Sequence, residues 1–580
     1  MTVTHEIEHA FAVDETFRVP AFDALKGVAS VGAMGVTRLD AVYYDTDDLR
    51  LARNQMTLRR REGGADAGWH LKLPGADGAH DEIGRPLDIV PAGDEWDARD
   101  AARPDLEAGA EQGLGFGGQA RVVVPRVPED LADLIAVWVR GAPLRPVARV
   151  STVRRTWLLR DAQGHDLLEV ADDQVRTRTM GRPLAGGGRV VASRWREIDV
   201  EVLDPAGERL LATADHLLLD AGARVAVGSS KLRRALAVDV GPPELAAMVA
   251  TGTESGPGTA AGTATDPGRG GAGSAGQVVR TYLARHATAL LAADPGVRLG
   301  TPESVHDLRV AARRLRSTIQ TFRPLLDGEQ AGRIEAGLRE IGEVLGRPRD
   351  AEVQHARLRR ALAATPGEQV LGPVAARVQE TLLGEVLRGR AEALAYLRSD
   401  RYYRFIDDLL AFVASVGTTD LARQPARRVL PRLVRRADRR LTRRVRTARL
   451  APPGTAQDVA YHRARKSAKR LRYACELMSP LVGRDARRLA ARARRVQEQL
   501  GAHQDAVMAV ARLRALAVAS NHAGEPSFTY GLLTAQEQDR AAALRRDVAR
   551  TWRKATRPGL RRWLRARPSG PRPAGSGRTM

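Results

Sequence analysis

The sequence predicts a multidomain α+β protein in which a strand-rich N-terminal part, closed into a barrel, precedes an all-helical part. Three features predict this fold class. Strand-like alternation recurs before residue 246, a Gly/Ala/Thr-rich stretch follows at 246–275, and helical periodicity dominates after it. Because the tail at 566–580 has the composition of a disordered end, the two folded domains are expected at 1–245 and 276–565.

The expected strands and helices of the first domain follow from their periodicity. Strand-like alternation occurs at 4–13, 41–45, 56–61, 69–73, 121–124, 147–159, 167–173 and 194–203. Helical spacing occurs at 131–139 and 208–221, and a Gly/Ala/Pro-rich stretch near 101–120 is expected to form a long loop. The segment 246–275 is expected to be a flexible linker, since it cannot bury a core.

The net charge of +23 is concentrated in the second half of the chain. Residues 276–580 hold 60 Lys+Arg against 28 Asp+Glu, and only three of these basic residues are lysine. Arginine's planar fork suits bidentate contacts with phosphate. The charge therefore predicts a polyanionic partner, which leaves polyphosphate, nucleic acid and an anionic membrane surface open.

Composition also indicates the cellular compartment of the protein. The one cysteine, Cys475, excludes an internal disulfide and favours a reducing environment. No secretory leader is recognisable, and no apolar run approaches the roughly 18 residues that span a bilayer. The sequence therefore predicts a cytoplasmic protein without a membrane span, and it says nothing of the oligomeric state.

Charged residues of both signs recur at strand period in the first domain. They are Glu6 and Glu8, Arg59 and Arg61, His70 and Lys72, Arg149 and Arg155, Glu169 and Asp173, and Glu197, Asp199 and Glu201. A charged face of a single strand usually meets water. When several strands repeat the pattern while their other faces are apolar, a closed barrel with a charged interior explains the whole set. Acidic clusters inside it would bind divalent metals, and basic clusters would bind phosphates.

The same residues carry a resemblance to a known family. HEIEHAF resembles the E-x-E-x-K opening of the CYTH family, and YYDTDDLRLARNQMTLRRR, GWHLKLP, WREIDVEVLD and SSKLRRAL resemble its later motifs in the same order. CYTH proteins are triphosphate tunnel metalloenzymes. The resemblance, which spans nearly all of 1–240, implies an antiparallel eight-stranded tunnel that hydrolyses or cyclises triphosphates with Mg²⁺ or Mn²⁺.

Site roles follow from that resemblance. The residues it implies for the metal are Glu6, Glu8, Glu169, Asp173, Glu197, Asp199 and Glu201, with Asp172 as the alternative to Asp173. Those implied for phosphate are Arg59, Arg61, Lys72, Arg149, Arg155 and Lys231, and the catalytic set is Glu6, Glu8, Arg59, Arg61 and Lys72. Such residues suit phosphoryl transfer, which depends on charge neutralisation and an aligned water.

One position departs from the family pattern. Ala10 stands where the opening motif has lysine, and His9 cannot replace that lysine because it points to the other face of the strand. Loss of this cation favours binding over cleavage in the tunnel. A polyphosphate-binding scaffold or granule protein without turnover is therefore the alternative to an inorganic triphosphatase.

The second domain contains an internal duplication. VHDLRVAARRLRSTIQTF at 305–322 aligns without gaps with YHRARKSAKRLRYACELM at 461–478, and LGRPRD at 345–350 matches LGAHQD at 500–505. On a helix the repeats form two basic stripes: His306, Arg309, Arg313 and Arg316, and His462, Arg465, Lys469 and Arg472. Because like charges at this spacing repel one another, the duplicated stripes indicate an anion site, although each could be a solvated face.

This region resembles the CHAD family from about residue 276 to residue 560. The resemblance implies two similar four-helix halves whose basic inner surface binds inorganic polyphosphate. Arginines at 430–446 are expected to add a further wall. A role of His306 and His462 as metal ligands is disfavoured because arginines surround them. Nucleic-acid binding is the third hypothesis, but aromatic residues make up only 4% of the chain, which disfavours stacking on single strands.

Overall fold

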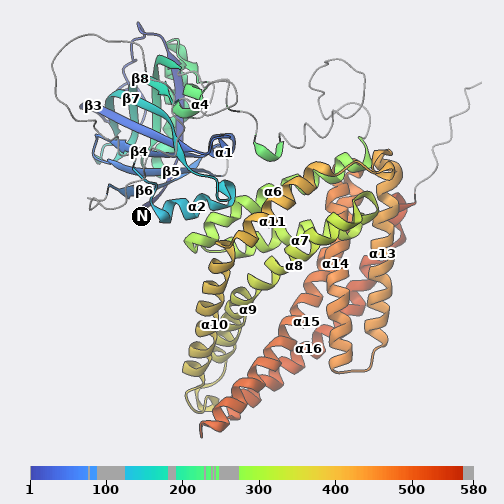
Figure 1. Cartoon of the computed structure of the whole chain (residues 1–580). Helices are drawn as coiled ribbons and strands as arrows, with labels where there is room; N and C mark the ends of the chain where they lie inside the picture. The colour runs from blue at the N-terminus through green and yellow to red at the C-terminus, as the bar shows by residue number, and fades with distance from the viewer. Residues whose placement is uncertain are drawn as a thin grey trace, which may run out of the picture. The chain divides into compact units, whose positions relative to one another are not determined.

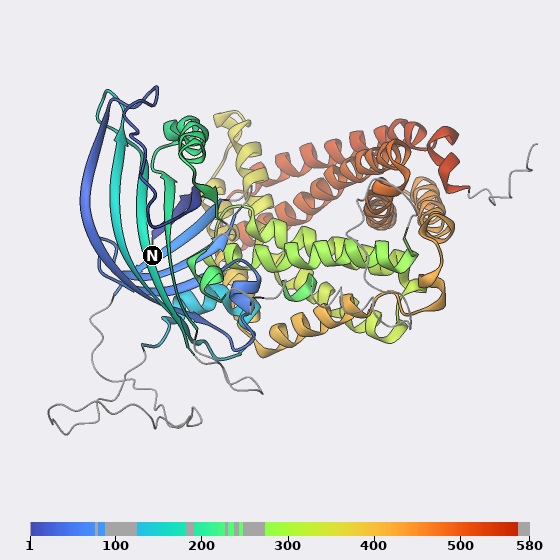
Figure 2. The same cartoon turned by 90° about the horizontal axis from the view of Figure 1, so that it is seen from above.

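The computed structural model describes residues 2–75, 79–87, 125–180, 191–226, 230–236, 240, 243–246 and 273–565. It divides into two compact units, Met1–Glu244 and Leu245–Met580 (Figures 1 and 2). The expected strand at 121–124, the expected loop at 101–120, most of the expected linker and the expected tail lie outside the described residues.

The first unit is built on one antiparallel sheet of ten strands in the order β1-β6-β5-β4-β3-β7-β8-β9-β2-β10. Their bounds are β1 Thr2–Glu6, β2 Glu8–Val13, β3 Ser30–Asp45, β4 Thr57–Glu62, β5 Gly68–Pro74, β6 His80–Pro86, β7 Arg145–Arg160, β8 Asp166–Thr179, β9 Ala192–Val202 and β10 Arg224–Val225. The sequence missed β6 and most of β3, and it joined β1 and β2 into one strand.

The sheet curls into an antiparallel half-barrel (Figure 2). Strands β1 and β2 are separated by Ile7 alone, yet β1 is an edge strand paired with β6 and β2 pairs with β9 and β10. The chain changes partner at Ile7, which explains why one predicted strand is two. The antiparallel, tunnel-like fold class is confirmed, but among the described residues no backbone ladder joins β1 to β10, so the sheet is curled rather than closed.

The described part of this unit also has the α-helices α1 Arg50–Arg53, α2 Glu129–Val139, α3 Glu208–Asp220 and α4 Lys231–Leu236. Helix α3 packs its apolar stripe, including Leu211 and Leu218, against Ile198, Val200 and Val170 of the sheet. These sheet residues alternate with the acidic residues of β8 and β9, whose side chains therefore lie on the opposite face. Because α3 covers the apolar face of β8 and β9, their charged face points into the half-barrel.

The second unit is all helical. Its helices are α6 Ala275–Leu299, α7 Ser304–Phe322, α8 Gly328–Val344, α9 Gly346–Ala363, α10 Val374–Leu397, α11 Asp400–Ser415, α12 Asp420–Arg423, α13 Ala426–Leu450, α14 Thr455–Val482, α15 Arg484–His522 and α16 Phe528–Ala555. None of the helices in the described part is both long and apolar enough to cross a membrane.

Reciprocal contacts relate the two halves of this unit. Arg314 of α7 forms an ion pair with Glu476 of α14 at 2.7 Å, and the repeat-equivalent Arg470 hydrogen bonds to Gln320, the equivalent of Glu476. Likewise Arg357 of α9 pairs with Glu537 of α16, and Arg512 of α15 pairs with Glu385 of α10. An exchange of equivalent contacts is the signature of two-fold symmetry. Helices α6, α7, α8–α9 and α10 therefore correspond to α13, α14, α15 and α16.

The corresponding helices differ in one respect. The first half has two helices, α8 and α9, where the second has the single 39-residue helix α15. Pro348 follows the break in LGRPRD, and His503 stands at the equivalent position of LGAHQD. Proline removes a helical N–H and its ring clashes with the carbonyl four residues earlier, which favours a break at this point. Helices α11 and α12 have no counterpart in the described part of the second half.

Candidate functional sites

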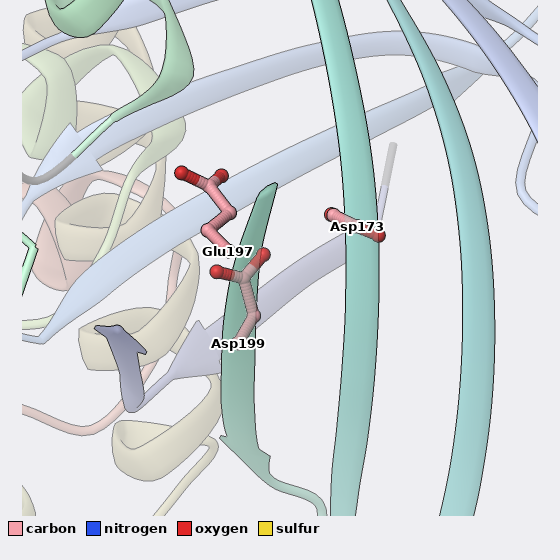
Figure 3. Close-up of side chains that lie close together, drawn as sticks. All are labelled: Asp173, Glu197 and Asp199. Carbon is pink, nitrogen blue, oxygen red and sulfur yellow. The ribbon is translucent and has the colours of Figure 1, made fainter. Parts of the chain in front are cut away.

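Three carboxylates meet on the inner face of the half-barrel. Asp173 of β8 and Glu197 and Asp199 of β9 each offer an oxygen, and these oxygens lie within 4.8 Å of one another (Figure 3). Register places Asp173 opposite Glu197. The ammonium group of Lys231 contacts all three, at 3.0 Å, 2.7 Å and 2.6 Å respectively. We call these three carboxylates the acid triad.

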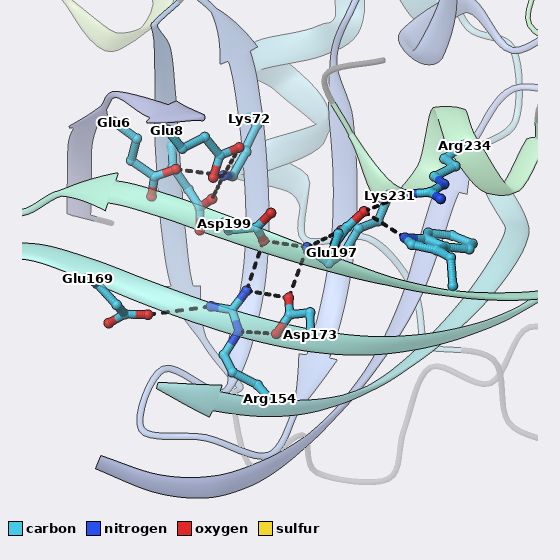
Figure 4. A network of polar contacts seen from close by, with 12 residues as sticks. Glu6, Glu8, Lys72, Arg154, Glu169, Asp173, Glu197, Asp199, Lys231 and Arg234 are labelled. Atoms are coloured by element: carbon cyan, nitrogen blue, oxygen red, sulfur yellow. Dashed lines mark hydrogen bonds and ion pairs between the residues drawn. The ribbon is translucent and has the colours of Figure 1, made fainter. Parts of the chain in front are cut away.

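Arg154 completes the neutralisation of the acid triad. It donates two hydrogen bonds of 2.8 Å to Asp173, lies 3.4 Å from Asp199, and approaches Glu169 at 3.6 Å (Figure 4). Burial, together with the neighbouring Asp173 and Glu197, raises the pKa of Asp199 to about 6 against the opposing charge of Lys231. Burial alone would raise the pKa of Asp173, but Lys231 and Arg154 hold it well below its usual range.

Two predicted phosphate contacts lie on the wrong face of β7. Arg155 is exposed, and Arg149 is exposed and lies 3.5 Å from Asp40. Residues at even positions of this strand point inward, as Arg154 does, because they share the parity of the buried Val150 and Thr152. The predicted inward placement of Arg149 and Arg155 is therefore wrong. Asp172 also points outward, where it pairs with Arg196, so Asp173 is the inward residue of the two alternatives.

A second cluster joins strands from both ends of the sheet order, β1 and β2. Lys72 of β5 contacts Glu6 of β1 at 2.7 Å, Glu8 of β2 at 3.3 Å and Glu82 of β6 at 3.3 Å (Figure 4). Because β5 and β2 are far apart in the sheet order, the contact to Glu8 crosses the interior. We call Lys72 and its three carboxylates the seam cluster. Burial alone would lower the pKa of Lys72, but Glu8, Glu82 and Glu6 raise it well above its usual value.

Basic side chains line the wall between the clusters. Arg59 of β4 lies 3.7 Å from Glu82, and Arg61 contacts Asp66. Burial lowers the pKa of Arg61 to about 10, and the charges of Arg59 and Arg154 contribute to the same shift. The Nε atoms of Arg59 and Arg61 are buried and make no hydrogen bond to the described residues. Buried N–H donors without partners are costly, and a phosphate oxygen would satisfy them.

Glu201 is the least neutralised acid of the interior. It lies opposite Glu8 and Glu169 in register and makes no ion pair within the described residues. Burial, followed by the charge of Glu6, raises its pKa to about 7.

Helix α4 fixes Lys231 in place. Leu232 and Leu236 pack against Tyr43, Val150 and Val175 on the inner face of the sheet. This apolar contact fills one part of the interior and leaves the acid triad and the seam cluster in the remainder. A helix of six residues has little stability of its own, so its position depends on this packing.

The donors present fit a divalent metal. Carboxylate oxygens are the ligands that Mg²⁺ and Mn²⁺ prefer, and the acid triad supplies three close together. Lys231 and Arg154 now balance that charge, so a bound cation requires one of them to withdraw. Either side chain can then contact phosphate instead.

The position of Ala10 agrees with the motif alignment. Ala10 lies opposite Asp199 in register, on the inner face, whereas His9 contacts Asp215 of α3 at 2.7 Å on the other face. No side-chain cation enters the interior from this position. Lys72 and Lys231 contact the acids on either side of it.

In the helical unit, four cations from the two stripes face one another. Lys469 of α14 is half-buried among Arg465, Arg313 and Arg309, and we call these four residues the basic cluster. Burial lowers the pKa of Lys469 to about 7, and the charges of Arg465, Arg313 and Arg309 contribute to the same shift. The Nε atoms of Arg313 and Arg465 are buried without a hydrogen-bond partner in the described chain. This is the charge distribution of an anion site.

Matching glycines position two of these arginines. Arg309 lies over Gly346 and hydrogen bonds to Asp350 at 3.2 Å, and Arg465 lies over Gly501, close to Asp505. A Cβ at Gly501 would lie 3.3 Å from the Nε of Arg465. The repeated Leu-Gly-x-x-x-Asp element thus leaves room for an arginine and supplies its counter-charge in both halves.

The other stripe residues are placed differently. Arg316 lies 3.6 Å from Glu335, and Arg472 pairs with Glu476 at 2.7 Å. His306 is exposed, whereas His462 is half-buried, and its Nδ1 has no partner among the described residues. The structure therefore brings together the middle of each stripe and not its ends.

Comparison with known proteins agrees with this geometry. The CYTH domain family matches residues 6–234, and the CHAD domain family matches residues 281–514. A Mycobacterium tuberculosis (strain ATCC 25618 / H37Rv) relative, described as uncharacterized protein Rv2226, is 34% identical over 558 residues, covering 95% of this chain and 96% of the relative. The chain is a CYTH–CHAD protein.

Solved structures resemble each domain separately. PptA from Streptomyces chartreusis is 24% identical and covers 48% of this chain and 99% of its own, with a TM-score of 0.39. The CHAD domain of the plant Ricinus communis is 23% identical and covers 50% and 96%, with a TM-score of 0.40. A putative adenylyl cyclase, HpAC1 from Hippeastrum, described as having a dominant triphosphatase activity, is 15% identical and covers 40% and 94%, with a TM-score of 0.19.

Family membership makes this CYTH–CHAD chain a phosphate-processing protein with a metal-dependent CYTH domain. Sequence reasoning missed several residues of that domain's interior clusters, among them Arg154, Glu82 and Arg234, which lies 3.2 Å from Glu197. Arg154 was passed over for its neighbour, although counting parity from the apolar Val150 would have selected it. Glu82 was missed because β6 carries no apolar alternation, and its buried contact with His70 gives no local signal.

Proposed function

We propose that the CYTH domain hydrolyses phosphoanhydride bonds of inorganic triphosphate or polyphosphate with Mg²⁺ or Mn²⁺, and that the CHAD domain binds polyphosphate. The observation that carries the proposal is the convergence of both charge signs in one interior. Glu6 of the edge strand β1 and Glu8 of β2, near the other end of the sheet order, contact the same Lys72. A purely structural charge network needs no unpartnered buried donors, yet Arg59 and Arg61 both present one.

Each cluster has a separate task in this proposal. The acid triad and Glu201 hold the cation, which when bound neutralises phosphate charge and activates water. Arg59, Arg61 and Arg154 bind the phosphate oxygens and orient the chain. Three carboxylates hold Lys72, so its ammonium group is already in position before substrate enters. Its contact with phosphate therefore requires no reorganisation of the site.

The test is a phosphate-release assay on tripolyphosphate, long-chain polyphosphate, ATP and thiamine triphosphate, with and without metal. We expect metal-dependent release from tripolyphosphate, and a loss of 100-fold or more in Glu6→Gln and in Arg59→Ala, on the order of one lost electrostatic donor. The matched control is Arg160→Ala, an arginine of the sheet whose partner is Asp166 on the next strand. Release that survives in both interior variants would contradict the proposal.

A second candidate function is polyphosphate binding without turnover. Two observations favour it: Ala10 supplies no cation opposite Asp199, and Lys231 occupies the centre of the acid triad. Tight binding of tripolyphosphate with no release under any metal would support this candidate. In that case Ala10→Lys is the variant in which turnover should first appear.

A further inference from the structure

Helix α13 presents a long arginine surface that the basic cluster does not include. It carries 11 arginines in 25 residues, and ten of them are exposed. Arg428, Arg432, Arg435, Arg439, Arg443 and Arg446 recur every three or four residues and form one stripe, which we call the outer stripe. It extends over roughly 27 Å of helix at 1.5 Å per residue. None of the 11 side chains makes an ion pair or a hydrogen bond to the described residues.

The arginines are not needed for the packing of this helix. The equivalent helix of the first half, α6, has the same length of 25 residues and packs on α7 as α13 packs on α14. It contains only three arginines, Arg280, Arg285 and Arg298. Since α6 and α13 occupy equivalent positions in the two halves, α6 shows how many arginines the packing of such a helix needs. The additional arginines of α13 therefore serve a purpose other than packing.

Holding this charge unpaired has a cost. Like charges three and four residues apart destabilise a helix by about 0.2–0.5 kcal/mol per pair. The one acidic residue of α13, Asp438, is buried and pairs with Arg561 instead of the outer stripe. A bound polyanion would remove the repulsion.

Helix α13 also carries charge beside the repeat helices. Arg440, which flanks the outer stripe, and Arg316, the last residue of the first repeat stripe, both contribute, after burial, to lowering the pKa of Arg470 of α14 to about 10. Cations of α7 and α13 therefore lie near Arg470.

The side-chain types of α13 indicate which kind of polyanion it would bind. The helix has no aromatic, Asn or Gln side chain, so it offers neither stacking surfaces nor amide readers of base edges. Its apolar face is buried, and Leu450 at its end is its one exposed large apolar residue, which is too little for membrane insertion. The exposed arginines of α13 are therefore left to contact regularly spaced phosphates.

We propose that the outer stripe of α13 is a second polyphosphate contact, which binds the part of a long chain that extends beyond the basic cluster and makes the domain prefer long chains over short ones. This inference rests on the proposed binding of polyphosphate by the CHAD domain. It adds a surface and a chain-length preference to that function.

The test compares two triple variants of the full chain that lose the same charge. Arg432→Gln/Arg435→Gln/Arg439→Gln removes half of the outer stripe. The matched control, Arg333→Gln/Arg494→Gln/Arg550→Gln, removes exposed arginines that pair with Glu329, Glu498 and Asp547 on their own helices. Binding of long-chain polyphosphate and of tripolyphosphate is measured by titration calorimetry with a chelator present, which prevents metal-dependent hydrolysis. Circular dichroism verifies folding of each variant.

We expect the stripe variant to bind long-chain polyphosphate roughly tenfold more weakly than the control variant, with tripolyphosphate binding unchanged in both. The slope of log affinity against log salt should fall by about two, at roughly 0.7 per lost phosphate contact. Equal long-chain affinities of the two triple variants would overturn the inference. So would an equal loss of tripolyphosphate binding in the stripe variant.

A third variant separates this inference from the function on which it rests. Arg309→Gln/Arg465→Gln alters the basic cluster and leaves α13 unchanged. If it loses binding while the stripe variant does not, the CHAD domain binds polyphosphate and the inference alone is wrong. If the unaltered chain binds duplex DNA through α13 and no polyphosphate, both the inference and the proposed function are wrong.

Discussion

Arg154 and Arg155 are neighbours in sequence with opposite surroundings. The first is held by Asp173 and Asp199 in the interior, and the second is exposed. Strand parity alone makes this difference. We expect Arg154→Gln to abolish phosphate release from tripolyphosphate and Arg155→Gln to leave it within about twofold, because a buried carboxylate loses its partner only in the first. Steady-state assays of the two variants, side by side, check this. Equal activities would show that the inner face is not the site.

If the CHAD domain binds polyphosphate as proposed, Lys469 is expected to make that binding dependent on pH. The groups that face it are Arg309 and Arg313 of α7, Arg465 of its own helix and Asp505 of α15. With its pKa lowered to about 7, it is largely neutral above that pH in the free protein, and a bound polyanion favours the protonated form. Affinity should therefore fall as pH rises through about 7, with proton uptake on binding near neutral pH.

The sign for stability is the reverse of that for binding. An unfolded lysine titrates near 10.5, so between about 7 and 10.5 the unfolded chain holds the proton that the folded chain has lost, and stability rises with pH. Lys469→Arg should abolish both dependences because arginine stays charged. Calorimetry in two buffers of different ionisation enthalpy measures the proton uptake. Identical uptake in the arginine variant would exclude Lys469 as the titrating group.

At the scale of elements, two of the four glycines of helix α8 are expected to respond in opposite ways to substitution by alanine. A Cβ at Gly337 would overlap the ring of Phe405 on α11, whereas one at Gly342 would meet nothing within 4 Å. We expect Gly342→Ala to stabilise the helical unit by about 0.5–1 kcal/mol, through helix propensity. Gly337→Ala should destabilise it by roughly 1–3 kcal/mol, because the clash exceeds that gain. Denaturant unfolding followed by circular dichroism compares the two, and stabilisation by both would contradict the packing of α8 on α11.

The break between α8 and α9 also depends on a single residue. In the first half, Pro348 favours a break between α8 and α9, whereas in the second half α15 continues through His503 at the equivalent position. The first half thus has two helices where the second has α15, while the exchanged pairs of Arg314 and Arg470 keep the contacts of the two halves equivalent.

At the scale of the whole molecule, the two units lie on one chain, and the stretch between them is rich in Gly, Ala and Thr. In the proposed function, tethering would raise the effective concentration of polyphosphate bound by the CHAD domain at the CYTH domain. We expect a protease site inserted within 251–272 to leave tripolyphosphate hydrolysis unchanged after cleavage, and to slow release from dilute long-chain polyphosphate severalfold. An uncleaved sample of the same variant is the control. Equal slowing of both substrates would mean that cleavage damages the CYTH domain itself.

Sequence by itself determined the fold class, the family and most of the charged set. Periodicity distinguishes strands from helices, and the paired repeats at 305–322 and 461–478 reveal the duplication. Tertiary structure decided which charges meet. Lys72 reaches Glu8 across the interior, Lys231 enters the acid triad from α4, and Arg154 replaces Arg155, because each depends on which face of the sheet is buried and how far it curls. Local spacing reports the parity of a strand but contains no information about the partner that lies opposite across a cavity.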